Sequence, residues 1–260
     1  MAYEEIDNMG AVRNTSRLKL TLAYDGRPFS GWQSQPNKNG VQDHLKKAFQ
    51  NILSAPVVVH GAGRTDAGVH ALGQVAHVDV PSERFALATW IAALNANLPP
   101  EIRVMRCQFA PRNFHARYSA IGKTYRYRLW SNPILQPLEI GRCWHLPFRI
   151  DRELLSEAAA RFVGFHDFAS FSASRGKPDE NTIRTIQRLD VLAAKDLIRL
   201  DLEGTGFLYR MVRMLLGSMV RVASGKENLA WIDDLLRHPA IGKSGYTAPA
   251  EGLYLLKVKY

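Results

Sequence analysis

The chain has 260 residues, and 46% of them are hydrophobic, which is typical of a globular protein that buries a core. Lysine plus arginine exceed aspartate plus glutamate by 34 − 24 = 10, a surplus that suits either a polyanionic partner or a merely basic surface. No apolar run approaches the roughly 18 residues of a membrane span, and the acidic start MAYEEIDNMG is unlike a secretory signal, so a cytoplasmic protein without membrane contact is predicted.

The first half of the chain alternates strand and helix patterns. Residues 1–16 lack periodicity and are expected to form a flexible extension. Leu18, Leu20 and Leu22 then alternate with polar residues, as in a half-buried strand, and 41–53 places its apolar residues on one helical face. The elements expected over 17–110 are strands at 17–24, 57–59, 74–80 and 102–110 and helices at 41–53 and 83–98.

The second half, 111–260, repeats this architecture with more decoration. Its expected elements are strands at 119–130 and 252–260, a hairpin over 185–204 with its loop near Ala194, and helices at 152–163, 207–223 and 229–238. Prolines cluster between the halves, at 111, 133, 137 and 147. The pattern predicts an α+β fold of two ferredoxin-like (RRM-like) β-α-β-β-α-β halves, with a mainly antiparallel sheet, helices on one face and a ligand cleft.

The segment GAGRTDAGVHA, residues 61–71, carries a lone carboxylate, Asp66, among three glycines. It lacks the G-K-[ST] ending of a phosphate-binding loop. A held, ionised carboxylate can act as a nucleophile, and glycines let a bulky substrate approach the backbone closely. The alternative is a tight turn in which Asp66 accepts a hydrogen bond from its own backbone.

A catalytic carboxylate that loses its water needs a cation to keep it charged. One candidate is Arg64, two residues away along the loop. The other lies in the apolar helix over 207–223, where Arg210, Arg213 and Arg221 share a narrow stripe with Gly217. Arg213 lies mid-helix and has the least room to reach solvent, so it is the stronger candidate.

The strand KTYRYRLW places Tyr125 on one face and Arg126 and Arg128 on the other. Tyrosine interleaved with arginine suits base stacking and phosphate binding, but equally a structural tyrosine pair with solvated arginines. Three histidines, His60, His70 and His77, lie close in sequence. They are expected not to form a metal site, because glycines argue against a helix there and no second carboxylate joins them.

With these motifs in order, the chain closely resembles the TruA family of tRNA pseudouridine synthases from about Leu18 to the C-terminus. The motifs are YDG with GWQ, GAGRTDAGVHA with GQV, NANLP, FHAR, KTYRYR, HDFASF, MVRMLLGSM and APAEGLYL. The resemblance implies isomerisation of uridine in the anticodon stem-loop of tRNA, at positions 38–40. It also implies a homodimer with a basic cleft and activity without a cofactor or metal.

Matched by motif, Asp66 resembles the family's catalytic aspartate, Arg213 its paired arginine and Tyr125 the tyrosine that stacks on the target uracil. Arg64 corresponds to an arginine that helps to displace the target nucleotide. The resemblance also implies substrate contacts for Arg117, Arg126, Arg128 and Leu253.

Two other classes of protein fit parts of this pattern. A non-catalytic RNA-binding protein would account for the charge and the tyrosines, but it has no need of Asp66 where a carboxylate repels phosphate. An RNA hydrolase would account for the aspartate, but it usually brings a second acid, a histidine pair or metal ligands.

Overall fold

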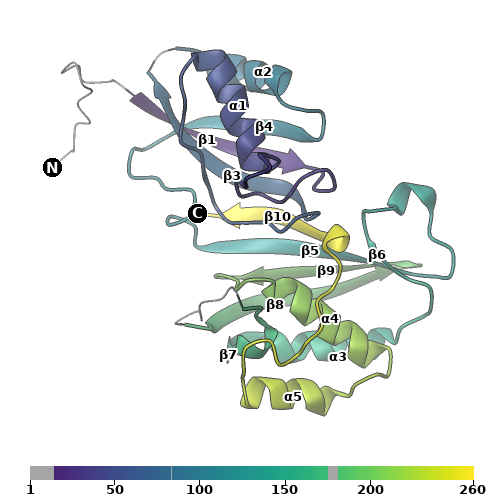
Figure 1. Cartoon of the computed structure of the whole chain (residues 1–260). Coiled ribbons are helices and arrows are strands. Elements are labelled where there is room, and N and C mark those ends of the chain that lie inside the picture. Colours follow the sequence, from purple (N-terminus) through teal and green to yellow (C-terminus); the bar gives the residue numbers. More distant parts are fainter. Residues whose placement is uncertain (1–14, 83, 175–180) are drawn as a thin grey trace.

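A computed structural model describes residues 15–82, 84–174 and 181–260. The described chain is built on a single ten-stranded sheet in which most neighbouring strands are antiparallel, as predicted. The main strand order is β4-β1-β3-β10-β5-β9-β8-β7, while β2 pairs with β3 and β6 pairs with β5. Figure 1 shows helices α1 and α2 at one end of this sheet and α3, α4 and α5 at the other.

The first half forms because leucine and valine alternate with polar residues along its strands. Leu18, Leu20 and Leu22 are fully buried on one face of the first strand, and Leu45 and Phe49 are buried on the inner face of the first helix. The elements are β1 (Thr15–Tyr24), α1 (Val41–Leu53), β2 (His60–Gly61), β3 (His70–Pro81), α2 (Leu87–Asn97) and β4 (Ile102–Ala110).

The second half follows the same alternation of strand and helix. Its elements are β5 (Gly122–Ser131), β6 (Trp144–Leu146), α3 (Arg152–Phe162), β7 (Gly164–Asp167), β8 (Ile183–Ala194), β9 (Leu197–Gly204), α4 (Met211–Ala223), α5 (Leu229–Arg237) and β10 (Leu253–Lys259). Helix α4 is the most buried of these helices, since it packs on α3 and buries Leu215, Met219 and Val222. None of the described helices reaches the length and apolarity that crossing a bilayer requires.

The two halves join where the last strand enters the middle of the sheet. Strand β10 pairs with β5 along most of its length, but it pairs with β3 only at Tyr254↔His70 and Leu255↔Ala71. Further along, β3 takes β2 as its partner at His77 and Ala76. Because β3 and β10 share so short a ladder, loops and side chains of both halves meet beside this junction.

Several predicted boundaries are wrong. Residues 57–59 form no strand, and only His60 and Gly61 pair with β3. Strands β6 and β7 were not predicted, because they have only three and four residues and no long alternation. The extension assigned to residues 1–16 is too long by two residues, because β1 begins at Thr15; its first 14 residues lie outside the described chain.

Candidate active site

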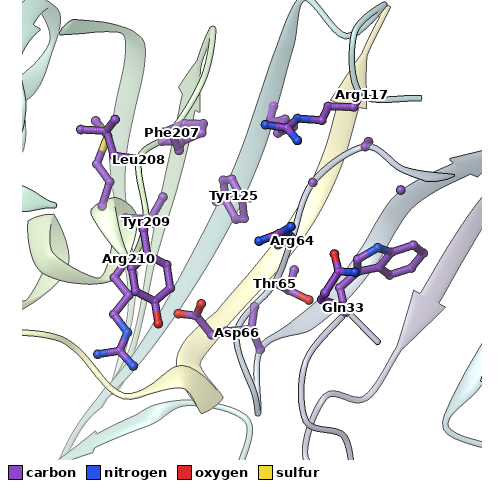
Figure 2. A pocket seen from close by; sticks show the side chains of 18 of the residues that line it. Gln33, Arg64, Thr65, Asp66, Arg117, Tyr125, Phe207, Leu208, Tyr209 and Arg210 are labelled. Atoms are coloured by element: carbon purple, nitrogen blue, oxygen red, sulfur yellow. The ribbon is translucent and has the colours of Figure 1, made fainter. Parts of the chain in front are cut away.

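A cavity of about 620 Å³ lies at the junction of the two halves. The first half contributes the glycine-rich loop, the second contributes β5, Leu253 and the start of α4, and the 115–118 segment closes one end. Figure 2 shows Asp66 near Tyr209 and Arg210 at one end, Tyr125 and Arg64 in the middle, and Arg117 at the opposite end. The structure therefore gathers residues from both halves of the sequence around one space.

The carboxylate of Asp66 is paired with the guanidinium group of Arg213. Nη1 of Arg213 donates to Oδ2 of Asp66 at 2.8 Å, and Nε of the same guanidinium donates to the carbonyl oxygen of Ala248 at 2.7 Å. The Asp66 side chain is 25% exposed and that of Arg213 is 14% exposed. Because two nitrogens of the guanidinium donate hydrogen bonds, its orientation relative to Asp66 is fixed. Part of the Asp66 carboxylate stays open to the cavity.

The backbone before α4 turns the cavity residues toward the loop. The helix was predicted from Phe207, but it begins at Met211, because Arg210 takes the left-handed conformation (φ +58°) at the N-cap. Residues 207–210 therefore precede the helix, and they line the cavity. The predicted stripe of residues on the helix is partly confirmed, because Arg213 and Gly217 both face the 246–248 segment. This segment lies so close to the helix that a Cβ on Gly217 would be 2.7 Å from the Tyr246 carbonyl oxygen.

The loop that carries Asp66 is fixed by the segment after β1. The Trp32 amide donates to the carbonyl oxygen of Thr65 at 3.0 Å, and the Thr65 hydroxyl bonds the Tyr24 hydroxyl at 2.9 Å. Gly31 has φ +92°, and a Cβ there would lie 2.6 Å from the Thr65 carbonyl oxygen. Only glycine therefore allows the two segments to approach so closely. The position of Thr65, next to Asp66, is then fixed by hydrogen bonds to both its backbone and its side chain.

Tyr125 forms an aromatic wall of the cavity. Its ring is 8% exposed and meets Phe207 edge to face, with centroids 5.1 Å apart. Burial, with Tyr24 and Asp66 nearby, raises the pKa of Tyr125, so its hydroxyl keeps its proton at neutral pH. Leu253 is buried and lines the cavity close to this ring, on the neighbouring strand.

The other charged side chains lining the cavity are cationic. Arg64 and Arg117 are exposed, and both line it, as does Arg210. Lys123, which precedes Tyr125 on the same face of β5, points at the loop so closely that a Cβ on Gly63 would lie 3.0 Å from its Nζ. Burial and the nearby Arg117 lower the pKa of Lys123.

The structure does not bring Arg126 and Arg128 to this cavity. Their side chains lie on the opposite face of β5, as the alternation predicted, and there they are engaged within the protein. Arg126 forms a bidentate pair with Asp201, with both N···O distances 2.7 Å, and Arg128 pairs with Glu139 at 2.7 Å. The substrate contacts expected of these two arginines are therefore not part of this site.

A cluster of histidines at the Arg117 end raises the question of a metal. Nitrogens of His60, His77 and His115 lie within 4.8 Å of one another. His70, which the sequence grouped with the first two, lies elsewhere and stacks on Tyr254 at 4.6 Å. Sequence spacing missed His115, because a loop distant in sequence brings it to the cluster.

Hydrogen bonds argue against metal binding by this cluster. The amide of Ala116 donates to Nδ1 of His77 at 3.0 Å, and the amides of Arg117 and Tyr118 donate to Nδ1 of His115 at 3.1 and 3.2 Å. In each neutral ring the proton then lies on Nε2, so the remaining nitrogen offers an N–H where a metal needs a lone pair. Two of the three rings thus do not fit a metal ion.

Comparison with known proteins agrees with this geometry. The family model described as tRNA pseudouridine synthase matches residues 21–119 and 158–260, which hold every residue of the cavity except Lys123 and Tyr125. The chain belongs to the tRNA pseudouridine synthase family. Membership identifies the protein as an isomerase that acts on uridine in tRNA.

Similar proteins match along nearly the whole chain. A tRNA pseudouridine synthase A of Akkermansia muciniphila is 44% identical over 252 residues, covering 94% of this chain and 95% of that one. One of Methylacidiphilum infernorum is 41% identical over 242 residues, covering 93% and 94%. A solved H/ACA RNP bound to a substrate RNA containing 2'-deoxyuridine has a TM-score of only 0.34 at 12% identity, over 78% of this chain and 43% of that one.

The packing of the loop predicts unequal effects of two neighbouring glycines on stability. A Cβ on Gly61 would collide with the buried indole ring of Trp32, whereas one on Gly63 would meet only the flexible end of Lys123. We expect Gly61→Ala to lower the free energy of unfolding by about 1–3 kcal/mol, and Gly63→Ala by less than about 0.5 kcal/mol. Urea unfolding followed by tryptophan fluorescence measures both. Equal losses would contradict this packing.

The buried imidazole of His77 predicts a pH dependence of stability. Burial, followed by the charges of Arg17, His60 and His115, lowers the pKa of His77 from 6.5 to about 4, against an opposing effect of Asp79. Between those values the unfolded chain binds a proton that the folded chain excludes, so stability falls as the pH drops.

The variant His77→Gln removes this titration and keeps an acceptor for the backbone. Between about pH 7 and pH 5 we expect the free energy of unfolding of the wild type to fall by about 1–2 kcal/mol more than that of the variant. Denaturant melts at a series of pH values measure the difference. Parallel pH profiles would show that folding does not lower the pKa of this ring.

Proposed function

We propose that the protein converts uridine to pseudouridine in the anticodon stem-loop of tRNA, at positions 38–40, with Asp66 as the catalytic carboxylate. The observation that carries this proposal is the Asp66–Arg213 ion pair at 2.8 Å, beside the Tyr125 ring in a cavity large enough for a nucleotide. Asp66 is the only carboxylate among the described residues that line the cavity. The motif order and the family membership support the same assignment.

The reaction breaks the N1–C1′ bond, turns the uracil and forms a C5–C1′ bond. A proton leaves C5 and one is gained at N1, so no electrons or groups are exchanged with a second reactant. We therefore propose activity without a cofactor. Asp66 acts in one of two ways, either by attack on a carbon of the sugar or base, or by removal of a sugar proton to give a glycal-like intermediate.

The target uridine must leave its stack before Asp66 can reach it, at a cost of about a few kcal/mol, which is lower in a loop than in a duplex. Tyr125 offers a face for the extracted base, and Leu253 packs beside it. Arg64 is exposed on the loop, which supports a role for it in filling the space that the base leaves. Arg213 holds Asp66 in position throughout.

We also propose that the two halves are ferredoxin-like and that the cavity is a basic cleft. Each half has the strand order expected of a ferredoxin-like unit, β4-β1-β3-β2 in the first and β10-β5-β9-β8 in the second, which supports that assignment. Five cationic side chains line the cavity against one carboxylate, which supports a basic cleft: Arg64, Arg117, Lys123, Arg210 and Arg213. The homodimer and the cytoplasmic location remain proposals that rest on the family.

Removal of the Asp66 charge tests the proposed function. We expect Asp66→Asn to lower the rate of tritium release from tRNA labelled with [5-³H]uridine by at least about 10³-fold, while tRNA binding is kept. Asp233→Asn, which removes a 29% exposed carboxylate of α5 that is paired with Arg161 outside the cavity, serves as the matched control and should behave as the wild type. Release mapped outside the anticodon stem-loop would refute the proposed positions, and full activity of Asp66→Asn would refute the proposed catalyst.

The ring of Tyr125 and its hydroxyl are predicted to contribute unequally. Because stacking needs only the ring, we expect Tyr125→Phe to keep kcat/KM within about threefold of the wild type. Tyr125→Ala should lose about 5- to 100-fold, in line with about 1–3 kcal/mol per stacked base. Single-turnover tritium release measures both, with thermal unfolding to check that the cavity still folds. Equal losses would assign the role to the hydroxyl.

A further inference from the structure

The cavity has a second aromatic surface at the end opposite Asp66. His60, His77, His115 and Tyr118 form it, and we call these four side chains the aromatic rim. The rings are in contact: His60 stacks on His77 at 4.7 Å with 13° between planes, His115 meets His77 at 4.7 Å, and Tyr118 lies on His115 at 4.4 Å. All but His77 line the cavity.

The rim runs from the core to the surface. His77 is 2% exposed and is fixed on β3, whereas the ring of Tyr118 is 77% exposed. A large exposed aromatic ring that is supported from behind by a second ring presents a flat face of fixed orientation. Such a face is a stacking platform for a nucleobase, because every base has a π face to place on it.

The rim includes two histidines that favour the neutral form. Burial and the neighbouring cations lower the pKa of both His77 and His115. Positive charge lies beside it instead, on Arg117, whose guanidinium is 5.6 Å from the Tyr118 ring centroid, and on Lys123. Burial and the charge of Arg117 lower the pKa of Lys123, and the one carboxylate among the described cavity residues, Asp66, is paired with Arg213, so an anion between Arg117 and Lys123 would be stabilised.

Asp66 and three of the four rim residues line the same cavity, and Figure 2 shows Tyr125 between Asp66 and Arg117, the chain neighbour of Tyr118. We propose that the aromatic rim is a second base-binding subsite, where the nucleotide next to the target uridine stacks on Tyr118 and His60 while Arg117 and Lys123 hold the linking phosphate. This inference rests on the proposed function, since it needs an RNA whose target base occupies the Asp66 end. The subsite anchors the strand on one side of the extracted base.

Substitution of Tyr118 tests the subsite. We expect Tyr118→Ala to raise the Kd for an anticodon stem-loop RNA by about 5- to 100-fold, and Tyr118→Phe by less than about threefold, because the ring carries the effect. Phe165→Ala removes an equally exposed aromatic side chain (72%) on β7, outside the cavity, and should leave Kd unchanged. An unchanged Kd for Tyr118→Ala would overturn the proposal.

An abasic residue in the RNA identifies the stacked nucleotide. Placed directly 5′ or 3′ of the target uridine, it should weaken wild-type binding at one of the two positions and add no further loss to Tyr118→Ala at that position. If the abasic residue weakens the binding of the wild type and of Tyr118→Ala by the same factor at both positions, no neighbouring base stacks on the rim. Tritium release by the wild type on unmodified RNA separates the two proposals: its absence refutes the proposed function, and its presence with no Tyr118 effect refutes only the subsite.

Discussion

The ion pair between Asp66 and Arg213 joins residues 147 positions apart in the sequence and one from each half of the fold. A partly buried carboxylate and guanidinium lose much of their hydration, and their attraction compensates only when the geometry is held. On one side, Trp32 and Tyr24 fix the residue next to Asp66. On the other, the carbonyl of Ala248 fixes the guanidinium. Contacts within both halves therefore hold the two members of this ion pair in position.

The sheet explains how two halves can approach so closely and still leave a cavity. Strands β3 and β10 share only two residue pairs, so the sheet joins the halves through a short ladder and loops meet beside it. Within each half the loop packing depends on a glycine, Gly31 against Thr65 in the first and Gly217 against Tyr246 in the second, where a side chain would strike a backbone carbonyl. Both glycines are therefore sites of tight packing.

The sequence predicted the elements with long, regular periodicity, because a repeat of two or of 3.6 residues records which face is buried. It also predicted Asp66, Arg213 and Tyr125 as neighbours, through motif resemblance. It missed what tertiary contacts decide: the left-handed Arg210 that delays α4, and the ion pairs that engage Arg126 and Arg128, whose expected substrate contacts stay a prediction. The alternation placed these arginines on the correct face, but it could not say that this face lies away from the cavity.

The charges around the cavity resolve a conflict that the proposed reaction creates. A free carboxylate would repel the phosphates that must approach it, yet a neutral acid could neither attack carbon nor accept a proton. Pairing Asp66 with Arg213 cancels the field of the carboxylate at a distance, because opposite charges 2.8 Å apart act on a remote phosphate as a dipole. Under the proposed function, Arg64, Arg117, Lys123 and Arg210 would then attract the RNA backbone without opposition. One internal ion pair would thus allow the same cavity to bind a polyanion and to present an anion to its base.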